Sequence, residues 1–275
     1  MFWVRLRSSV VLVVLACVFL IAGGNLLGAV IATLSVIAFR ELMHACRTEE
    51  DGRAGLLEYV GYAGIFLYYL TIMLTRDFSL GMGCLVLFFL AEMFVYVFRF
   101  PKYRAMQLMT AFFCAFYPAV LFSFVYLTRQ LQYGVYLVWM IFISSWICDT
   151  CAYVTGMMFG KHKLAPILSP KKSIEGAVGG VLGSALAGAL FSWAFLFPVT
   201  QEIAVIGLVA LIGAAGAVIS QVGDLAASAI KRNHDIKDYG KLIPGHGGIM
   251  DRFDSVLFTA PVIYYLSVLL LRVGH

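Results

Sequence analysis

The sequence predicts an all-α polytopic membrane protein with about nine transmembrane helices and a cytoplasmic N-terminus. Of its 275 residues, 62% are hydrophobic and only 13% are charged, whereas a soluble domain carries about 25% charged residues. Apolar runs follow one another from end to end without a polar linker, and the basic residues gather in alternate loops. We therefore expect one integral membrane domain over residues 1–275.

The apolar runs give the expected spans, because a helix that crosses the hydrocarbon needs about 20 apolar residues. The charged start and apolar middle of the first run resemble a signal peptide. A second run begins after only Gly23, Gly24 and Asn25, which favours a retained hairpin over cleavage after Ala22. The expected spans are 8–22, 26–42, 57–75, 79–98, 106–127, 134–158, 174–197, 202–228 and 253–272.

The basic residues predict the orientation of these spans. With a cytoplasmic N-terminus, 17 of the 20 Lys and Arg residues fall in cytoplasmic segments, and only Arg76, Arg129 and Arg272 fall on the other side. This is the asymmetry that the positive-inside rule requires. The net charge of +5 is therefore explained by topology and by attraction to anionic headgroups. We expect a protein of the cell (inner or plasma) membrane, of bacterial source, that binds no nucleic acid.

Three carboxylates lie inside expected spans and away from their ends, where ionisable residues indicate functional sites. Glu92 lies near Arg99, which favours a structural ion pair. Asp224 is four residues after Ser220 and seven before Lys231, so all three share one helix face. A buried Asp–Lys pair that fixes packing is the alternative to a functional role for this stripe.

Asp149 follows the first cysteine of a Cys148-x-x-Cys151 pair and precedes Thr150, Tyr153, Gly156 and Gly160. These side chains are typical of a helix that lines a polar interior. A redox role for the two cysteines is not favoured, because no βαβ pattern surrounds them and cysteine is a common small apolar filler. The six cysteines predict no disulfide framework.

The segment "SPKKSIEG" (169–176) predicts the start of the seventh span, with Ser169 as N-cap and Pro170 at the first helical position. Lys171 and Lys172 would then lie in the first turn, where the helix dipole disfavours cations. Positive-inside topology is one explanation. A bound polyanion is the other, because phosphate would satisfy both the lysines and the backbone N–H groups.

The segment 231–254 mixes cations and carboxylates around a glycine-rich turn. Such a mixture suits a metal–polyphosphate complex, in which carboxylates bind Mg²⁺ and Lys or Arg hold phosphate oxygens. The sequence contains no P-loop and no HExxH zinc motif. Helix capping by Asp251-x-x-Asp254 is a compatible second role. The charged residues are Lys231, Arg232, Asp235, Lys237, Asp238, Lys241, Asp251, Arg252 and Asp254, and His246 lies among them.

The stretch "SAIKRNHDIKDYGKLIPGHGGIMDRFD" (228–254) resembles the signature of the phosphatidate cytidylyltransferases, also called CDP-diacylglycerol synthases. "SPKKSIEGAVGG" is also similar to this family, and the similarity covers about residues 149–254. The N-terminal spans resemble the family only in being apolar and in number. Many members carry Glu three residues after the Asp that matches Asp224, where this chain has Ala227.

The resemblance implies an enzyme that joins CTP and phosphatidic acid, with Mg²⁺ and a second cation such as K⁺, as a homodimer in contact with membrane lipids. It implies N-terminal spans over 1–133 and catalytic spans with cytoplasmic loops over 134–275, with the active site on the cytoplasmic face. The metal ligands would be Asp224 and Asp251, with Asp149, Ser220 and Asp254 as weaker candidates. Asp224, Lys231, Asp251 and Arg252 would be catalytic, and the substrate would contact Lys171, Lys172, Ser173, Arg232, Lys237, Asp238, His246, Gly247 and Gly248.

Two alternatives remain open from the sequence. A relative that uses an isoprenoid or ether lipid phosphate would have the same apolar spans. An ion-coupled transporter could use Asp149 and Asp224 as a relay, but no internal repeat is evident and the polar cluster lies on one side of the membrane.

Overall fold

The computed structural model describes residues 2–46, 55–245 and 247–274, with only the backbone described at 2–7 and 9. Within these residues, eight helices are long and apolar enough to cross a membrane, and a shorter apolar helix covers 10–22. This confirms the all-α polytopic class, and each expected span corresponds to one of these helices. The N-terminal orientation stays a prediction.

The helices follow the apolar runs closely. Two of the long helices contain a five-residue π-helical segment, η1 or η2, so that α6–η1–α7 and α8–η2–α9 are each continuous. The helices are α1 (Phe2–Ala22), α2 (Gly24–Ala45), α3 (Leu56–Thr75), α4 (Phe78–Phe98), α5 (Ala105–Gln130), α6 (Gly134–Phe142), η1 (Ile143–Ile147), α7 (Cys148–Phe159), α8 (Ile174–Phe191), η2 (Ser192–Leu196), α9 (Phe197–Thr200), α10 (Ala204–Asn233) and α11 (Met250–Leu271).

The described residues form two compact units. The first contains residues within 1–123 together with 234–252, and the second contains 124–233 together with residues within 253–275. The connection between α10 and α11 therefore belongs to the first unit. The predicted division of one membrane domain at residue 133 stays a prediction.

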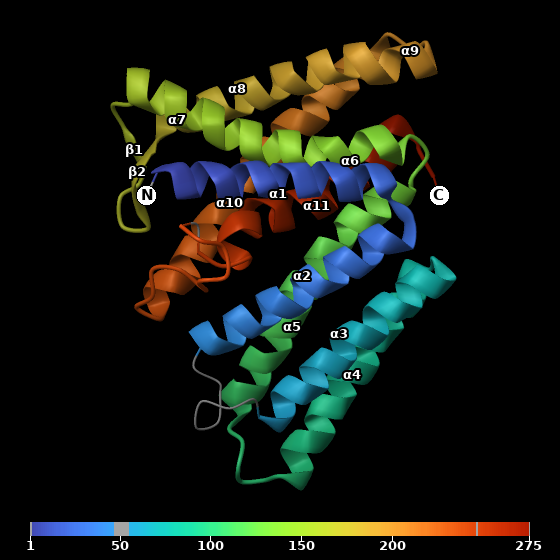
Figure 1. The fold of residues 1–275 in the computed structure, drawn as a ribbon, viewed down its shortest axis with the longest axis vertical. Coiled ribbons are helices and arrows are strands. Elements are labelled where there is room, and N and C mark those ends of the chain that lie inside the picture. Colours follow the sequence, from blue (N-terminus) through green and yellow to red (C-terminus); the bar gives the residue numbers. More distant parts are fainter. Residues whose placement is uncertain (1, 47–54, 246, 275) are drawn as a thin grey trace. The chain divides into compact units, whose positions relative to one another are not determined.

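In the first unit, α3 and α4 form a helical hairpin and lie side by side (Figure 1). Asp77 ends the connection as the N-cap of α4, where its carboxylate accepts hydrogen bonds from Ser79 N at 2.7 Å and Leu80 N at 3.3 Å. A β-carbon at Gly64 would lie 2.6 Å from Phe88 Cγ, so this glycine lets the two helices approach.

The second unit packs α7, α8 and α10 through small residues (Figure 1). A β-carbon at Gly180 would lie 2.8 Å from Cys148 Sγ, and one at Gly213 would lie 2.9 Å from the Ser184 carbonyl oxygen. Small residues permit this approach of helix backbones. Gly180 of α8 and Gly213 of α10 therefore serve helix packing.

A short antiparallel hairpin, β1 (Lys163–Ala165) and β2 (Ser169–Ser173), precedes α8. The predicted helix start at Ser169 and Pro170 is therefore wrong. The N-cap is Ser173, whose Oγ accepts a hydrogen bond from Gly176 N at 3.1 Å. Lys171 and Lys172 lie on an extended strand and not in a first helical turn, so the argument from the helix dipole does not apply to them.

Candidate functional site

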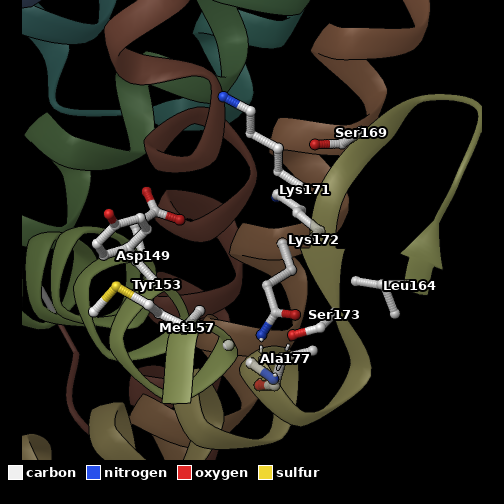
Figure 2. Close-up of a pocket in the computed structure, with 13 residues that line it drawn as sticks. Asp149, Tyr153, Met157, Leu164, Ser169, Lys171, Lys172, Ser173 and Ala177 are labelled. Carbon is white, nitrogen blue, oxygen red and sulfur yellow. Dashed lines mark hydrogen bonds between the residues drawn. The ribbon is translucent and has the colours of Figure 1, made fainter. Parts of the chain in front are cut away.

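The second unit contains a pocket of about 370 Å³ formed by α7, β1, β2, α8 and α10, which we call the polar pocket because charged residues stand in its otherwise largely apolar lining. This volume is within the ordinary range for ligand sites. Figure 2 shows Asp149 and Tyr153 of α7 on one wall and Lys171 and Lys172 of β2 on the opposite wall. The lining residues are Asp149, Ala152, Tyr153, Gly156, Met157, Leu164, Ser169, Lys171, Lys172, Ser173, Gly176, Ala177 and Gln221.

An ion pair joins two of the predicted site residues beside this pocket. Lys172 Nζ contacts Asp224 Oδ2, and the two side chains are 25% and 29% exposed. The strand thus brings a lysine to the stripe on α10 that contains Asp224. The pair is therefore partly exposed and is not sealed in the core.

Further carboxylates surround Asp224 in the second unit. Asp254 is 8% exposed and lies within electrostatic range of Asp224, Lys231 and Asp149. Ser220 is fully buried, and among the described residues its Oγ has no hydrogen-bond partner. The structure therefore brings together Asp149, Asp224, Asp254, Lys172 and Lys231, as one charged cluster.

This cluster is not a closed metal cage. No group of three or more His, Cys, Asp and Glu side chains within the described parts of the chain is arranged to hold a metal ion. Mg²⁺ is usually held by one or two carboxylates, with water and substrate phosphates completing its shell. The donor set is thus consistent with a magnesium ion that arrives with a polyphosphate.

Ser173 and Gln221 hold the walls of the pocket in place. Ser173 Oγ caps α8, and β-carbons at Gly156 and Gly160 would lie 2.9 and 2.8 Å from it. Gln221 Nε2 donates to the Ala177 carbonyl oxygen at 3.1 Å and so ties α10 to α8. The sequence reasoning missed Gln221, although an amide within an apolar span was a visible signal.

A second cavity of about 390 Å³ adjoins the polar pocket and is almost wholly apolar. Leu164, Ala177 and Gln221 line both cavities, and the remaining lining comes from α8 and α10. The second unit therefore offers a charged compartment beside an apolar one, which suits a ligand with a polar head and an apolar tail. The remaining residues are Val178, Val181, Leu182, Val218, Val222 and Leu225.

The glycine-rich segment before α11 belongs to the first unit. Ile243 N donates to the Gly247 carbonyl oxygen at 2.8 Å and closes a tight turn. Gly245 and Gly247 have φ values of 77° and 90°, which residues with a β-carbon rarely adopt. The predicted role of these glycines in a tight turn is therefore confirmed for the described residues, while His246 lies outside them.

Asp251, which lies in the first helical turn of α11, stabilises this glycine-rich loop. Its Oδ2 accepts hydrogen bonds from Tyr239 N at 2.8 Å and Gly248 N at 3.0 Å. Asp251 thus reaches back to backbone N–H groups of the segment that precedes α11. The predicted capping box of Asp251 and Asp254 is wrong, because α11 already begins at Met250 and Asp254 Oδ1 accepts from Ser255 N. The metal role of Asp251 stays a prediction.

Glu41 of α2 is a second carboxylate on the same segment, and the sequence reasoning missed it. Its Oε1 accepts from Ile249 N at 3.0 Å and its Oε2 from Met250 N at 2.8 Å. Glu41 is 8% exposed. The other predicted residues of this region, Arg232, Lys237, Asp238 and Arg252, have exposed side chains.

Comparison with known proteins matches residues 3–270 to the model of the "Cytidylyltransferase family". A "Phosphatidate cytidylyltransferase" of Staphylococcus saprophyticus is 30% identical over 277 residues, covering 98% of this chain and 99% of the relative. A protein of the same name from Staphylococcus aureus is 31% identical over 270 residues, covering 96% and 98%. The likeness thus extends through both units and includes the N-terminal spans.

Proposed function

Because the chain belongs to the cytidylyltransferase family, we propose that it transfers CMP from CTP to phosphatidic acid, giving CDP-diacylglycerol and pyrophosphate. The observation that carries the choice of a lipid substrate is the charged pocket of Lys171 and Lys172 beside an apolar cavity. Relatives named for this reaction match the chain over nearly its whole length.

In the proposed reaction, an oxygen of the lipid phosphate attacks the α-phosphorus of CTP. The bond from that phosphorus to the oxygen bridging to the β-phosphate breaks, and pyrophosphate leaves with the electron pair. The attacking phosphate is already an anion near neutral pH, so no strong general base is needed. The chain must instead hold two polyanions together, and positioning and electrostatics dominate such transfers.

The cations of the second unit fit this task. Lys171, Lys172, Lys231 and Arg232 would hold phosphate oxygens through charge-assisted hydrogen bonds. The contact of Lys172 with Asp224 keeps this lysine beside the carboxylate cluster before the substrate arrives. Lys237 and Arg252, which belong to the first unit, are proposed to stabilise the leaving pyrophosphate.

The carboxylates fit a magnesium site completed by the substrate. We propose Asp224 and Asp251 as its ligands, with Asp149, Ser220 and Asp254 as weaker candidates and with a second cation such as K⁺ nearby. A magnesium ion held by these residues would supply Lewis-acid neutralisation of the phosphate charge. The proposal also includes a homodimer in the cell membrane of a bacterium, with the site on the cytoplasmic face.

The test is a reaction of the purified full chain with CTP, phosphatidic acid and Mg²⁺, followed by measurement of pyrophosphate and of the CDP-lipid. Parallel reactions contain undecaprenyl phosphate or an ether-linked phosphatidic acid. Stoichiometric CDP-diacylglycerol is expected with phosphatidic acid. A folded sample that turns over only another lipid phosphate, or none, would refute the proposed substrate. Asp224→Asn and Asp251→Asn with near-normal turnover and unchanged Mg²⁺ dependence would refute the ligand assignment.

A further inference from the structure

Two carboxylates from distant parts of the chain hold the segment that leads into α11. Asp251 binds the N–H groups of Tyr239 and Gly248, and Glu41 binds those of Ile249 and Met250. Ser8 Oγ of α1 also donates to the Pro244 carbonyl oxygen at 3.1 Å. The N-terminal helices therefore contribute directly to the conformation of the glycine-rich turn.

Glu41 supplies a hydrogen-bond acceptor for the N-terminus of α11. The first N–H groups of a helix have no partner within the helix, and a side chain at the N-cap usually accepts from one of them. Ile249, which directly precedes the first helical residue Met250, has no polar side chain that could do so. A carboxylate at this end also interacts favourably with the positive end of the helix dipole. Glu41 therefore acts as the cap of α11 from a different helix.

Two glycines fit closely against this carboxylate. A β-carbon at Gly248 would lie 2.5 Å from Glu41 Cδ, and one at Gly240 would lie 2.5 Å from Glu41 Oε1. Real β-carbons do not approach other atoms so closely, so an alanine at either position would push the carboxylate away. Gly240 and Gly248 are thus explained by Glu41 and not by a requirement for positive φ.

The bound N–H groups also limit where substrate can bind. A helix N-terminus is a ready anion site when its N–H groups point at the ligand. The N–H groups of Gly248, Ile249 and Met250 already donate to protein carboxylates. These N–H groups are therefore already occupied by protein carboxylates. In the proposed function, phosphate oxygens would bind lysine and arginine side chains instead.

From these contacts we propose that Glu41 is a positioning residue, which fixes the segment 240–251 and through it the orientation of the Asp251 carboxylate. The proposal rests on the proposed function, in which Asp251 binds the metal that arrives with CTP. In this proposal Glu41 acts through the backbone N–H groups that it binds and is not itself a ligand of the substrate or the metal. Its loss should change the dependence of the rate on Mg²⁺ and CTP and should loosen the segment.

The test compares Glu41→Gln with Glu58→Gln. Glu58 is a matched control, because it is also a buried carboxylate of the first unit (3% exposed), but its recorded hydrogen bond is with Tyr62 Oη, at 2.5 Å. A glutamine at position 41 keeps one carbonyl acceptor and turns an amide toward the other N–H group. We expect kcat/KM for CTP to fall about 10- to 100-fold and the Mg²⁺ concentration for half-maximal rate to rise at least fivefold, with Glu58→Gln within twofold of the parent.

Amide hydrogen exchange of the peptide covering 240–253 gives a readout that needs no activity. We expect exchange there to be at least tenfold faster in Glu41→Gln than in Glu58→Gln. Equal exchange in the two variants would overturn the proposal even if the parent enzyme were active. An inactive parent with the expected exchange difference would refute the proposed function and keep the structural role of Glu41.

A double variant separates positioning from a general loss of folding. Gly240→Ala alone should displace Glu41 and reproduce the kinetic change of Glu41→Ala. Because Glu41→Ala removes the two nearest atoms that the new methyl group would meet, Glu41 Oε1 and Cδ, Glu41→Ala/Gly240→Ala should be no more than twofold worse than Glu41→Ala alone. The proposal would be overturned if the losses in kcat/KM of the two single variants multiplied in the double variant. It would also be overturned if kcat/KM only followed the fraction of folded protein while the dependence on Mg²⁺ and CTP stayed unchanged.

Discussion

Replacement of Lys172 by methionine removes the cation that contacts Asp224 and keeps a long unbranched side chain on β2. Lys172 has two distinct consequences in the structure. It neutralises part of the carboxylate cluster around Asp224, and it presents a cation to the polar pocket. The substitution therefore tests whether the ion pair serves stability or the binding of phosphate.

The structure sets the size of each effect. Because Lys172 and Asp224 are 25% and 29% exposed, water screens the pair, and exposed pairs contribute about 0.2–1 kcal/mol. A charge-assisted hydrogen bond to a phosphate is worth about 1.5–3 kcal/mol. The second value corresponds to a loss of roughly 10- to 100-fold in kcat/KM. A binding role therefore predicts a large kinetic effect with a small effect on the free energy of unfolding.

The assay measures kcat/KM for CTP and the midpoint of thermal unfolding in the same detergent. Lys163→Met is the matched control, because Lys163 lies on β1 of the same hairpin and does not line the pocket. We expect Lys172→Met to lose roughly 10- to 100-fold in kcat/KM and Lys163→Met to stay within twofold. A Lys172→Met protein that unfolds much earlier and keeps its kcat/KM would refute the reasoning.

Three further predictions concern α10, α8 and the metal. Gly223→Ala should destabilise the protein by about 1–3 kcal/mol in thermal unfolding, because its β-carbon would lie 2.9 Å from the Asp254 carbonyl oxygen. The control is Gly207→Ala on the same helix, whose β-carbon meets nothing within 4 Å and which should be neutral or stabilising. Equal midpoints of unfolding for the two variants would contradict this prediction. Ser173→Ala should lower the free energy of unfolding by about 1 kcal/mol through loss of the cap of α8, and an unchanged midpoint would count against that cap. Chelation of divalent cations by EDTA should abolish pyrophosphate release, and excess Mg²⁺ should restore it; activity that survives chelation would exclude the metal proposal.

The transmembrane helices could be predicted well because hydropathy and length act locally. Each span is a long apolar run, and each run ends at glycine, proline or charged residues that are visible in the sequence. The expected span 174–197 corresponds to the continuous helix that begins at Ile174. Such patterns do not depend on which helix packs against which.

The hairpin before α8 could not be predicted because two serines compete as helix caps. Ser169 followed by Pro170 is a good helix start, but the φ of proline is also compatible with an extended strand. The structure uses Ser173, and the base of the hairpin is held by His162 Nδ1, which lies 2.6 Å from Glu175 Oε1. The two members of this pair are thirteen residues apart, so no local pattern indicates it.

The candidate site could be predicted in part. The charged residues around Asp224 were visible as a polar stripe on an apolar helix. In the structure, Lys172 forms an ion pair with Asp224 of this stripe. Glu41 was not recognised, because it stands beside Arg40 at the end of a span, where a charged residue is ordinary. Its partners Ile249 and Met250 lie 208 and 209 residues away, and only the folded chain brings them together.

The contact of Glu41 with Gly240 and Gly248 has a consequence for the exchange of segments between relatives. A chimera that takes its first helices from one parent and its signature segment from another inherits the carboxylate and its two glycines separately. If either parent differs at one of these three positions, the hybrid carries an unfilled cap or a steric clash that neither parent has. Position 41 should therefore be matched to positions 240 and 248 before the halves are joined.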